Sequence, residues 1–320
     1  MTDRCLLTVH AHPDDESSKG AGTVAKYHAD GVRTVLVCCT GGEEGDILNP
    51  AMDRPEVRAD LEAVRRQELD AAAGIIGYDE VVMLGYRDSG MPDSEANARP
   101  EAFANAPLDE AVGRLVAIIR RERPQVVVTY GDDQKGYPHP DHLMVHDVTM
   151  PAIDKAADPD AYPDAGAPHE VQKVYWTEWS RARMEAMHAK FLELGLESPF
   201  DDKWFERESR DHRITTRVST EGYGDVRWDA LLAHATQVDP TSPFWFGLPR
   251  DVLVSMAPKS VTTPIAMGIA EKLGGIPPLT AVLVISTGVI GAIAVTPLMN
   301  LLRVRDMRAR GVAAGVATHE

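Results

Sequence analysis

Short apolar runs alternate with amphipathic segments over the first 250 residues, and this alternation constrains the fold more than any other feature of the sequence. The runs have the length of buried strands, and the segments between them place apolar residues at helical spacing. Strands that alternate with helices in this way form a mainly parallel sheet with helices on both faces. We therefore expect an α/β, Rossmann-like fold. The expected strands are residues 5–9, 34–39, 81–84, 126–130 and 173–177, and the expected helices are residues 18–30, 56–76 and 108–123.

The charge of the chain excludes one large class of partner. Lysine and arginine number 33 against 49 aspartate and glutamate residues, which gives a formal net charge of −16. Nucleic-acid binding needs a basic footprint that neutralises phosphates, so nucleic acid is not an expected partner. Cys5, Cys38 and Cys39 all lie in apolar runs, as is typical of reduced thiols in the cytoplasm. The N-terminus has no signal-peptide pattern, and we expect a cytoplasmic protein.

Two segments rich in histidine and aspartate lie 127 residues apart and share one pattern. They are His12-Pro13-Asp14-Asp15-Glu16 and His139-Pro140-Asp141-His142, and each follows an expected strand. In open α/β folds the chemistry lies in loops at the carboxyl ends of the strands, so the two segments can converge. The pair therefore predicts a metal-dependent hydrolytic site.

Three residues of these segments are candidate metal ligands. His12 and Asp15 are three residues apart in one loop, and His142 would add a third ligand from the other. A catalytic zinc ion takes three protein ligands and leaves one position open. Nitrogen and oxygen donors suit Zn²⁺, and Fe²⁺ or Co²⁺ as well. A single histidine at a strand end is more often a hydrogen-bonding or core residue, but the whole set favours a metal site.

The remaining polar residues of the two segments are candidates for proton transfer. Asp14 is a candidate general base, although an aspartate there can equally cap the following helix. His139, paired with Asp141, would be held protonated as a general acid that also stabilises an oxyanion. Tyr137 would donate a hydrogen bond to the same oxyanion, or it is a surface tyrosine in a turn.

Basic and acidic residues near these loops are candidates for substrate binding. The loop from Gly41 to Asp46 follows the second expected strand, and its carboxylates would contact sugar hydroxyls or an ammonium group. Lys19 and Arg65 lie near the same expected edge of the sheet. Most such side chains are simply solvated, and the residues alone leave that alternative open.

Five segments together resemble a known enzyme family. They read HAHPDDESSKGA, TGGEEGDILNPAMDRPEV, GYRDSGMP, GYPHPDHLMVH and HATQVDPTSPFWF. Over residues 1–250 the chain resembles the LmbE-like zinc-dependent N-deacetylases, and within them the branch of amidases that act on mycothiol S-conjugates. The resemblance implies an LmbE-like deacetylase fold and zinc as the cofactor. It also implies the roles of individual residues: zinc ligands His12, Asp15 and His142; general base Asp14; His139 and Tyr137 for the oxyanion and the leaving amine; Asp141 as the residue that tunes His139; and Asp46, Arg65 and Asp88 in a sugar-inositol pocket.

Lys19 bears on the substrate that the resemblance implies. The amidase-like sequences read ESSKG at this point, as here, whereas the deacetylases of mycothiol biosynthesis carry serine at the lysine position. The implied reaction is hydrolysis of the amide that joins glucosaminyl-inositol to an S-conjugated N-acetylcysteine, a step of detoxification. The alternative is removal of the N-acetyl group from the unconjugated precursor. Either way the partner is a small molecule, and no pattern indicates an oligomeric state.

The sequence changes character near residues 251–255. Residues 1–250 carry 27 basic and 45 acidic side chains, whereas residues 251–320 carry 6 and 4. No charged residue occurs from Gly274 to Leu302, and Arg303, Arg305, Arg308 and Arg310 follow. From Met256 onward the chain resembles a fragment of the LrgB (CidB-type) membrane proteins. We interpret residues 251–320 as a second region, joined by gene fusion, recombination or a sequence error.

The apolar tail can be placed in two ways. Leu279 to Thr296 is a plausible but short membrane helix of 18 residues, or else a buried helix rich in glycine and alanine. The arginines after Leu302 would lie on the cytoplasmic side by the positive-inside rule, as would the catalytic region, and a single span cannot satisfy both. We expect a loosely packed helical tail without a catalytic part. The competing hypothesis is a membrane-associated protein with a vestigial hydrolase domain.

Overall fold

The computed structural model describes residues 4–132, 138–200, 202–240, 242, 255, 262–302 and 306. The chain divides into two compact units, which are described separately. The first comprises Met1–Met184 and Arg207–Asp239, and the second comprises Glu185–Glu206 and Pro240–Glu320.

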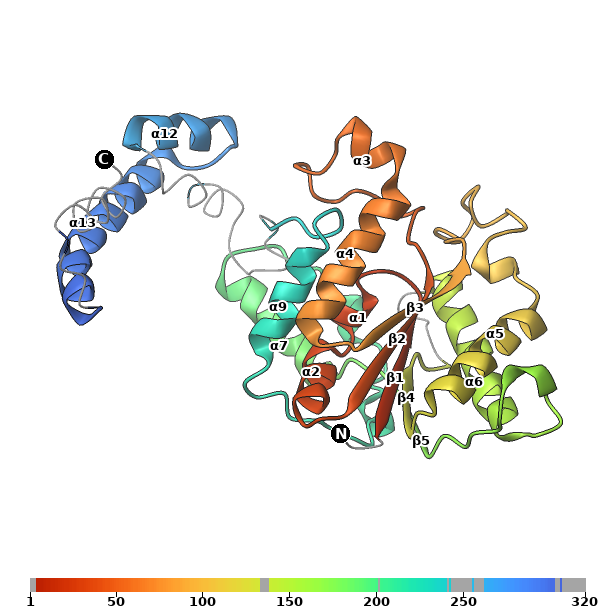
Figure 1. Cartoon of the computed structure of the whole chain (residues 1–320). Coiled ribbons are helices and arrows are strands. Elements are labelled where there is room, and N and C mark those ends of the chain that lie inside the picture. Colours follow the sequence, from red (N-terminus) through yellow and green to blue (C-terminus); the bar gives the residue numbers. More distant parts are fainter. Residues whose placement is uncertain are drawn as a thin grey trace. The chain divides into compact units, whose positions relative to one another are not determined.

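The first unit is built on one sheet of five parallel strands among the described residues, in the order β3-β2-β1-β4-β5 (Figure 1). The strands are β1 (Cys5–His10), β2 (Arg33–Thr40), β3 (Glu80–Tyr86), β4 (Val126–Thr129) and β5 (Lys173–Trp176). All five strands expected from the sequence are present, and the α/β fold is confirmed. The strand order runs outward in both directions from β1. The loops after β1 and β4 therefore leave the sheet at a topological switch point, where such folds bind their ligands.

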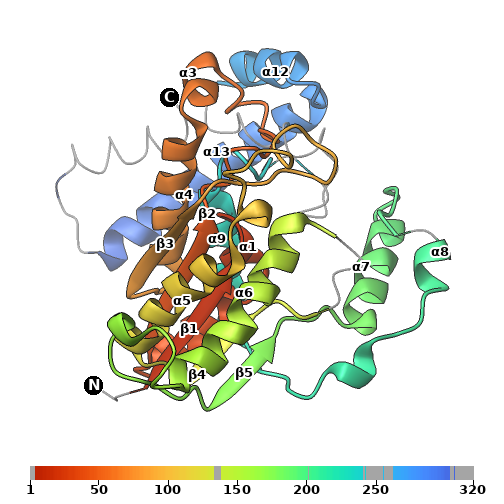
Figure 2. The ribbon, with the colours of Figure 1, turned by 90° about the vertical axis from the view of Figure 1, so that its right-hand side faces the viewer.

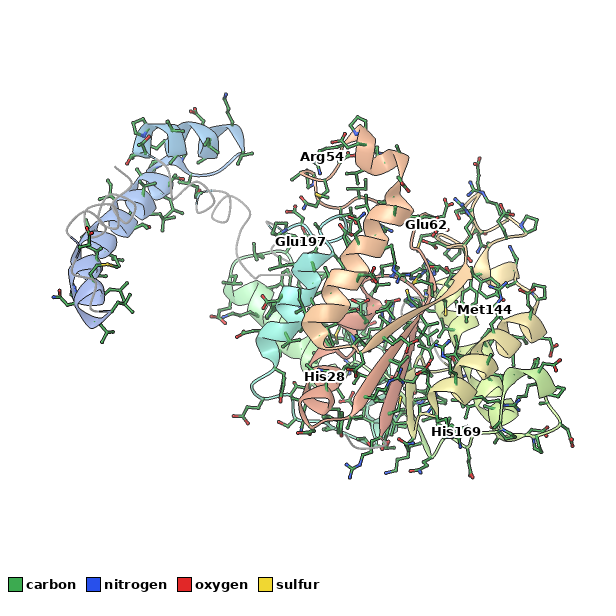
Figure 3. The ribbon with its side chains drawn as sticks, in the orientation of Figure 1. His28, Arg54, Glu62, Met144, His169 and Glu197 are labelled. Atoms are coloured by element: carbon green, nitrogen blue, oxygen red, sulfur yellow. The ribbon has the colours of Figure 1, made fainter. Side chains whose placement is uncertain are left out.

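Helices cover both faces of this sheet, as the alternating pattern predicts. One face packs against α5 (Leu108–Glu122) and α6 (Pro140–Ala157), which lie toward the viewer in Figure 2, and Met144 (labelled in Figure 3) belongs to this core. The other face packs against α2 (Ala21–Ala29), α4 (Leu61–Ile76) and α9 (Gly224–Ala233). Shorter elements complete the order: α1 (Asp15–Ser18), α3 (Pro55–Ala59), η1 (Phe103–Asn105), η2 (Pro163–Ala165) and η3 (Asp211–Arg213).

Two expected helices are each interrupted once. The segment expected as residues 18–30 stops after α1 and resumes at Ala21, because Gly20 adopts a φ of +154°, outside the helical range. The segment expected as residues 56–76 breaks at Asp60, which separates α3 from α4. The first break matters for function, since it ends α1 soon after Asp15 and Glu16, the residues that begin this helix.

The second unit contains helices of the apolar tail. They are α12 (Thr263–Lys272) and α13 (Pro277–Leu301), which pack against each other; α8 (Asp202–Phe205) and most of α7 (Arg181–Glu193) also fall in this unit. Thr280 donates from its hydroxyl to the carbonyl of Ser255, and the amide of Ile276 donates to the Ser255 hydroxyl. Several large apolar side chains of α13 are exposed, including Val282, Ile290 and Leu301. Within the described residues, no helix combines the length and the apolar character needed to cross a membrane. All four arginines that follow Leu302 lie outside the described residues.

Candidate metal centre

The two histidine-proline segments meet at the carboxyl edge of the sheet. His12 and Asp14 lie in the connection from β1 to α1, and Asp15 and Glu16 begin α1, while His139 caps α6 and His142 lies in its first turn. The rings of His12 and His142 are 5.4 Å apart between centroids. The convergence expected from their positions after β1 and β4 is therefore present.

His12, Asp15 and His142 form a cluster that could hold a metal ion. The Asp15 Oδ2 atom lies 3.5 Å from His12 Nδ1 and 3.5 Å from His142 Nε2, and one ligand atom of each residue lies within 4.8 Å of the others. Bonds of about 2.0–2.1 Å around a tetrahedral ion would place ligand atoms about 3.3 Å apart, so these donors fit zinc closely. Asp15 and His142 are buried and His12 is partly buried, which leaves one side of the set open.

A carboxylate fixes the orientation of His12. Its Nε2 atom donates to Asp141 Oδ2 at 3.0 Å, so that Nδ1 faces Asp15. Asp141 in turn accepts hydrogen bonds from the amide and the hydroxyl of Ser89. A histidine whose second nitrogen is bound to a carboxylate is the common arrangement at protein metal sites.

A second acidic cluster lies next to the first. His12, Asp88, His139 and Asp141 also bring possible ligand atoms together. Here, however, both carboxylates face the Nε2 atom of His12, with Asp141 Oδ2 at 3.0 Å and Asp88 Oδ1 at 3.6 Å, on the opposite side of the ring from Nδ1 and Asp15. These groups are thus occupied in orienting His12 and the loop after β3. The set of His12, Asp15 and His142 remains the better metal site.

Asp14 lies next to this cluster, and its carboxylate accepts no hydrogen bond from the described residues. It occupies the N-cap position of α1 but makes no capping bond, and no hydrogen bond to its carboxylate occurs within the described part of the chain. The capping alternative therefore does not apply. Burial and the neighbouring Asp15 carboxylate raise the pKa of Asp14 to about 7. A carboxylate with such a pKa can accept and release a proton near neutral pH.

His139 differs from the expectation in its protonation and its partner. Its Nδ1 atom accepts the amide of Asp141 at 3.2 Å, which leaves the proton of the neutral ring on Nε2. Burial and the nearby His12 lower the pKa of His139 to about 4. The Asp141 carboxylate hydrogen-bonds to His12 and Ser89, and its charge raises the pKa of His139 by less than burial and His12 lower it. At neutral pH His139 is a hydrogen-bond donor through Nε2.

The candidate substrate residues lie in different surroundings. Lys19 forms an ion pair with Asp15 and lies over the Tyr130 ring at 5.4 Å. Arg65 is buried and donates to the carbonyl oxygens of Gly42, Gly45 and Asp46, so it supports the loop from inside.

Asp88, Asp46 and Tyr137 complete the set. Asp88 is buried and accepts the amides of Gly90 and Glu44 at 2.8 and 3.2 Å. Asp46 is exposed. Tyr137 lies outside the described residues.

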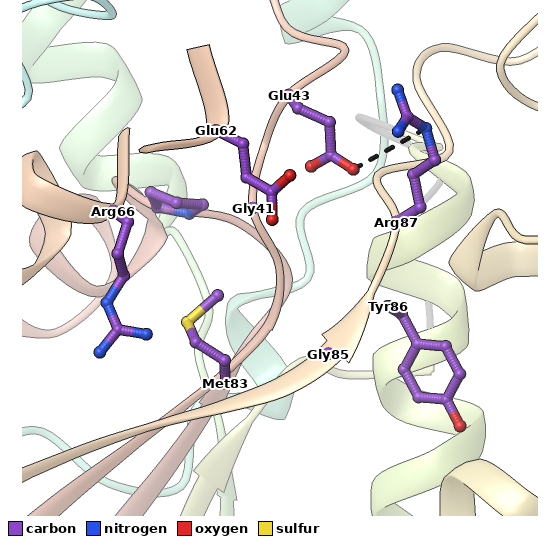
Figure 4. A pocket seen from close by; sticks show the side chains of 9 residues that line it. Gly41, Glu43, Glu62, Arg66, Met83, Gly85, Tyr86 and Arg87 are labelled. Carbon is purple, nitrogen blue, oxygen red and sulfur yellow. Dashed lines mark ion pairs between the residues drawn. The ribbon is translucent and has the colours of Figure 1, made fainter. Parts of the chain in front are cut away.

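A small cavity opens beside the metal centre, next to Pro13. Its volume is about 300 Å³ and its walls come from the loop after β2, the end of β3 and the start of α4 (Figure 4). Glu43 and Glu62 bring carboxylates to it, and Arg87 lies 3.9 Å from Glu43. The Glu43 Oε2 atom is buried without a hydrogen-bond partner. Arg66 also lines the cavity, which therefore offers both carboxylate acceptors and guanidinium donors to a polar ligand.

Sequence reasoning missed several residues that shape the site. Tyr130 stacks on His142, and Ser89 holds Asp141. Buried Glu16 and His234 form a hydrogen bond of 2.7 Å beneath Asp14. Tyr130 directly follows β4 and Ser89 lies three residues after β3, the same signal that marked the histidine segments, whereas the contact to His234 has no local signal.

Comparison with known proteins agrees with this site. Residues 7–153 match the PIG-L family, described as GlcNAc-PI de-N-acetylase. A mycothiol S-conjugate amidase of Streptomyces coelicolor is 45% identical over 262 residues, which cover 79% of this chain and 88% of that protein. A 1D-myo-inositol 2-acetamido-2-deoxy-alpha-D-glucopyranoside deacetylase of Geodermatophilus obscurus is 43% identical over 254 residues, which cover 76% and 85%.

Structural comparison supports the fold alone. The N,N'-diacetylchitobiose deacetylase of Pyrococcus horikoshii shares 19% identity, with a TM-score of 0.51 over 85% of this chain and 80% of that one.

The C-terminal region matches a second family. Residues 234–320 match the LrgB-like family, which places the start of the match 22 residues before Met256, where the sequence analysis put it. Residues 234–239 nevertheless belong to the first compact unit, in which Thr236 is bound by Glu68. With an LrgB-like segment at its C-terminus, the chain belongs to the PIG-L (LmbE-like) family of metal-dependent amide hydrolases.

Proposed function

We propose that the chain hydrolyses the amide bond of mycothiol S-conjugates, releasing an N-acetylcysteine S-conjugate and glucosaminyl-inositol. The observation that carries the proposal is the convergence of His12, Asp15 and His142 beside the uncommitted carboxylate of Asp14. The similarity to the Streptomyces coelicolor amidase supports the choice of substrate. We infer that residues 1–250 carry this activity in the cytoplasm and that residues 251–320 contribute no catalytic group.

The metal is inferred to be zinc, with Fe²⁺ as the alternative, held by His12, Asp15 and His142. Bound there, it would act as a Lewis acid toward the amide carbonyl and lower the pKa of water. The ligand residues are prepared for this by their own contacts. Asp141 orients His12, and the ring of Tyr130 packs on His142.

Side chains of the protein transfer the protons and stabilise the developing charge. Asp14 takes the proton from the attacking water and returns it to the departing nitrogen, which becomes an amine. His139, neutral and protonated at Nε2, donates a hydrogen bond to the amide oxygen as negative charge develops on it. Tyr137 is a proposed second donor to that oxygen. His139 thus stabilises charge, and the proton for the leaving amine comes from Asp14.

Substrate contacts would lie on the side of Lys19 and of the cavity beside Pro13. In this proposal Lys19 makes the enzyme prefer S-conjugates over the acetylated precursor, because it forms an ion pair with Asp15 next to the substrate. The acceptors of Glu43 and Glu62 suit a ligand rich in hydroxyl groups, such as an inositol ring. Arg65 would act indirectly, because its guanidinium holds the loop that carries Glu43.

The experiment measures bound metal and the hydrolysis of a bimane-labelled mycothiol conjugate. We expect about one ion per chain and turnover of the conjugate, with both lost in His142→Ala. Retention of both in that variant would overturn the ligand assignment. Fractionation of the full chain tests the competing hypothesis of a membrane-associated protein with a vestigial hydrolase domain. That hypothesis requires the full chain in the membrane fraction.

A second candidate function is deacetylation of N-acetylglucosaminyl-inositol. The 43% identity to the Geodermatophilus obscurus deacetylase favours it nearly as strongly. Exchange of Lys19 for serine discriminates between the two. We expect the wild-type chain to prefer the conjugate and Lys19→Ser to shift activity toward the acetylated precursor. An unchanged ratio of the two activities would remove Lys19 as the basis for choosing the amidase.

A further inference from the structure

Asp14 has an unusual backbone conformation for a non-glycine residue. Its φ is +108° with ψ −26°, in the left-handed half of conformational space that side chains with a Cβ rarely adopt. Such conformations persist where the surroundings fix them, and they concentrate at functional sites. We therefore expect neighbouring groups to hold the backbone of Asp14 in this conformation.

The backbone of Asp14 is held at both ends. Its carbonyl accepts the amides of Ser17 and Ser18 at 3.1 and 3.0 Å, in the first turn of α1. Its amide donates to Glu16 Oε2 at 3.0 Å. The second bond comes from a side chain, so the conformation of Asp14 depends on where the Glu16 carboxylate lies.

The Glu16 carboxylate is positioned in turn by His234. Glu16 Oε1 accepts from His234 Nε2 at 2.7 Å and from the Ser17 hydroxyl. Glu16 is 1% exposed and His234 is not exposed at all. Gln237 Nε2 lies 3.4 Å from His234 Nδ1, which favours a proton on Nε2, facing Glu16. A buried carboxylate and a buried histidine outside the metal centre thus connect directly to the proposed general base.

The segment that carries His234 is itself anchored. His234 caps the end of α9, which packs against α1 (Figure 1). Thr236 donates from its amide and its hydroxyl to Glu68 of α4, and Asn49 donates to the carbonyl of Ala235. Residues 234–237 therefore form a fixed support under the loop after β1.

We propose that Glu16 and His234 are positioning residues that hold Asp14 in the conformation needed for proton transfer. The inference rests on the proposed function, in which Asp14 is the general base. In this proposal neither Glu16 nor His234 binds the metal or contacts the substrate. Both act through the amide of Asp14.

Three variants test the pair. His234→Leu removes the N–H that binds Glu16, and His234→Gln keeps an N–H donor at the end of a side chain of similar reach. Thr236→Val is the matched control, because it removes the 2.6 Å bond to Glu68 in the same segment without touching Glu16. Comparison of the three separates the positioning of Asp14 from anchoring of the segment.

The kinetic outcome is a fall in kcat without a change in KM. We expect His234→Leu to lower kcat by at least about tenfold at an unchanged metal content, since small displacements of a reacting group are costly. KM should stay within about twofold, and His234→Gln should recover most of kcat. Equal losses in His234→Leu and Thr236→Val would overturn the proposal, as would an unaltered kcat in His234→Leu.

A variant that preserves the fold covers the case in which His234→Leu does not fold. Glu16→Asp keeps the charge but shortens the side chain by one methylene, so the carboxylate cannot reach both the Asp14 amide and His234. We expect kcat to fall several-fold at constant metal content. A wild-type kcat in Glu16→Asp contradicts the proposal.

Hydrogen exchange gives a readout that needs neither substrate nor metal. We expect the Asp14 amide to exchange about tenfold faster in His234→Leu than in the wild type or in Thr236→Val. An equal exchange rate in all three proteins overturns the inference. If the wild-type chain does not hydrolyse the conjugate, the proposed function fails, while the exchange rates still decide whether His234 holds Asp14.

Discussion

The ring of Tyr130 stacks on the ring of His142, with centroids 4.6 Å apart and planes inclined by 13°. Tyr130 is 2% exposed, and its hydroxyl accepts the amide of Ala11 at 3.3 Å. The phenol therefore connects the loop after β1 with the first turn of α6. It fixes the ring plane of one proposed metal ligand.

Removal of this stacking should weaken metal binding. We expect Tyr130→Leu to raise the Kd for zinc about tenfold, because groups that orient ligands contribute on this scale. Tyr130→Phe keeps the ring but loses the hydroxyl, which also hydrogen-bonds to Asp15, so its Kd should rise less than that of Tyr130→Leu. Chelator competition measures both. A Kd for zinc in Tyr130→Leu equal to that of the wild type would show that Tyr130 does not orient His142.

Asp141 should matter to metal binding through His12. Asp141→Asn weakens the acceptor that holds His12 Nε2, and we expect the Kd for zinc to rise about 10–100-fold. Asp147 is exposed on the same helix, which makes Asp147→Asn a suitable control with wild-type affinity. The same chelator titration applies. If both variants bind zinc alike, Asp141 does not orient the ligand.

Arg65 should contribute to stability more than its neighbour Arg66. Arg65→Leu leaves the carbonyls of Gly42, Gly45 and Asp46 without their donor, and we expect the free energy of unfolding to fall by about 1–3 kcal/mol. Within the described part of the chain, the one ion pair of Arg66 is the exposed pair with Asp70 at 3.0 Å, so Arg66→Leu should cost less than about 1 kcal/mol. Urea unfolding of the two variants provides the comparison. Similar losses would show that the carbonyl contacts of Arg65 add little.

Glu122 should make stability depend on pH in the acid range. Burial alone would raise the pKa of Glu122, but hydrogen bonds from Arg121 and Arg33 outweigh it and lower the pKa below the ordinary value of 4.5. A lowered pKa in the folded state gives stability that is complete above the unfolded-state pKa and is lost as pH falls through the folded-state value. Glu122→Gln should therefore lose less stability than the wild type between neutral pH and the acid range. Urea midpoints over that range test this, and parallel curves for the two proteins would refute it.

The strands and the convergence of His12, Asp15 and His142 could be predicted because their signals are local. Each strand is a short apolar run, and His12, Asp15 and His142 follow strands in compact motifs. The break at Gly20 was missed because the helical pattern of apolar residues continues across it, whereas the backbone turns at a φ of +154°. Periodicity reports the buried face of a segment and does not report a single residue that leaves the helix.

The partner of Asp141 shows where local reasoning fails. The sequence pairs Asp141 with His139, two residues away, and their possible ligand atoms do lie within 4.8 Å of each other, but the hydrogen bonds of the Asp141 carboxylate go elsewhere. The Asp141 amide binds His139, while its carboxylate points toward His12 and Ser89, which come from other loops. The bond between Glu16 and His234 spans 218 residues and could be found only in the folded chain.

The separation of 218 residues between Glu16 and His234 also determines the order in which the contacts of the site can form. Chains fold from the N-terminus during synthesis, and residues 12, 15 and 142 are made well before residue 234. The proposed metal ligands are thus available on the ribosome while the bond from His234 to Glu16 has still to form. A nascent chain can gather its ligands early, but the support beneath Asp14 is completed only when the end of α9 has emerged.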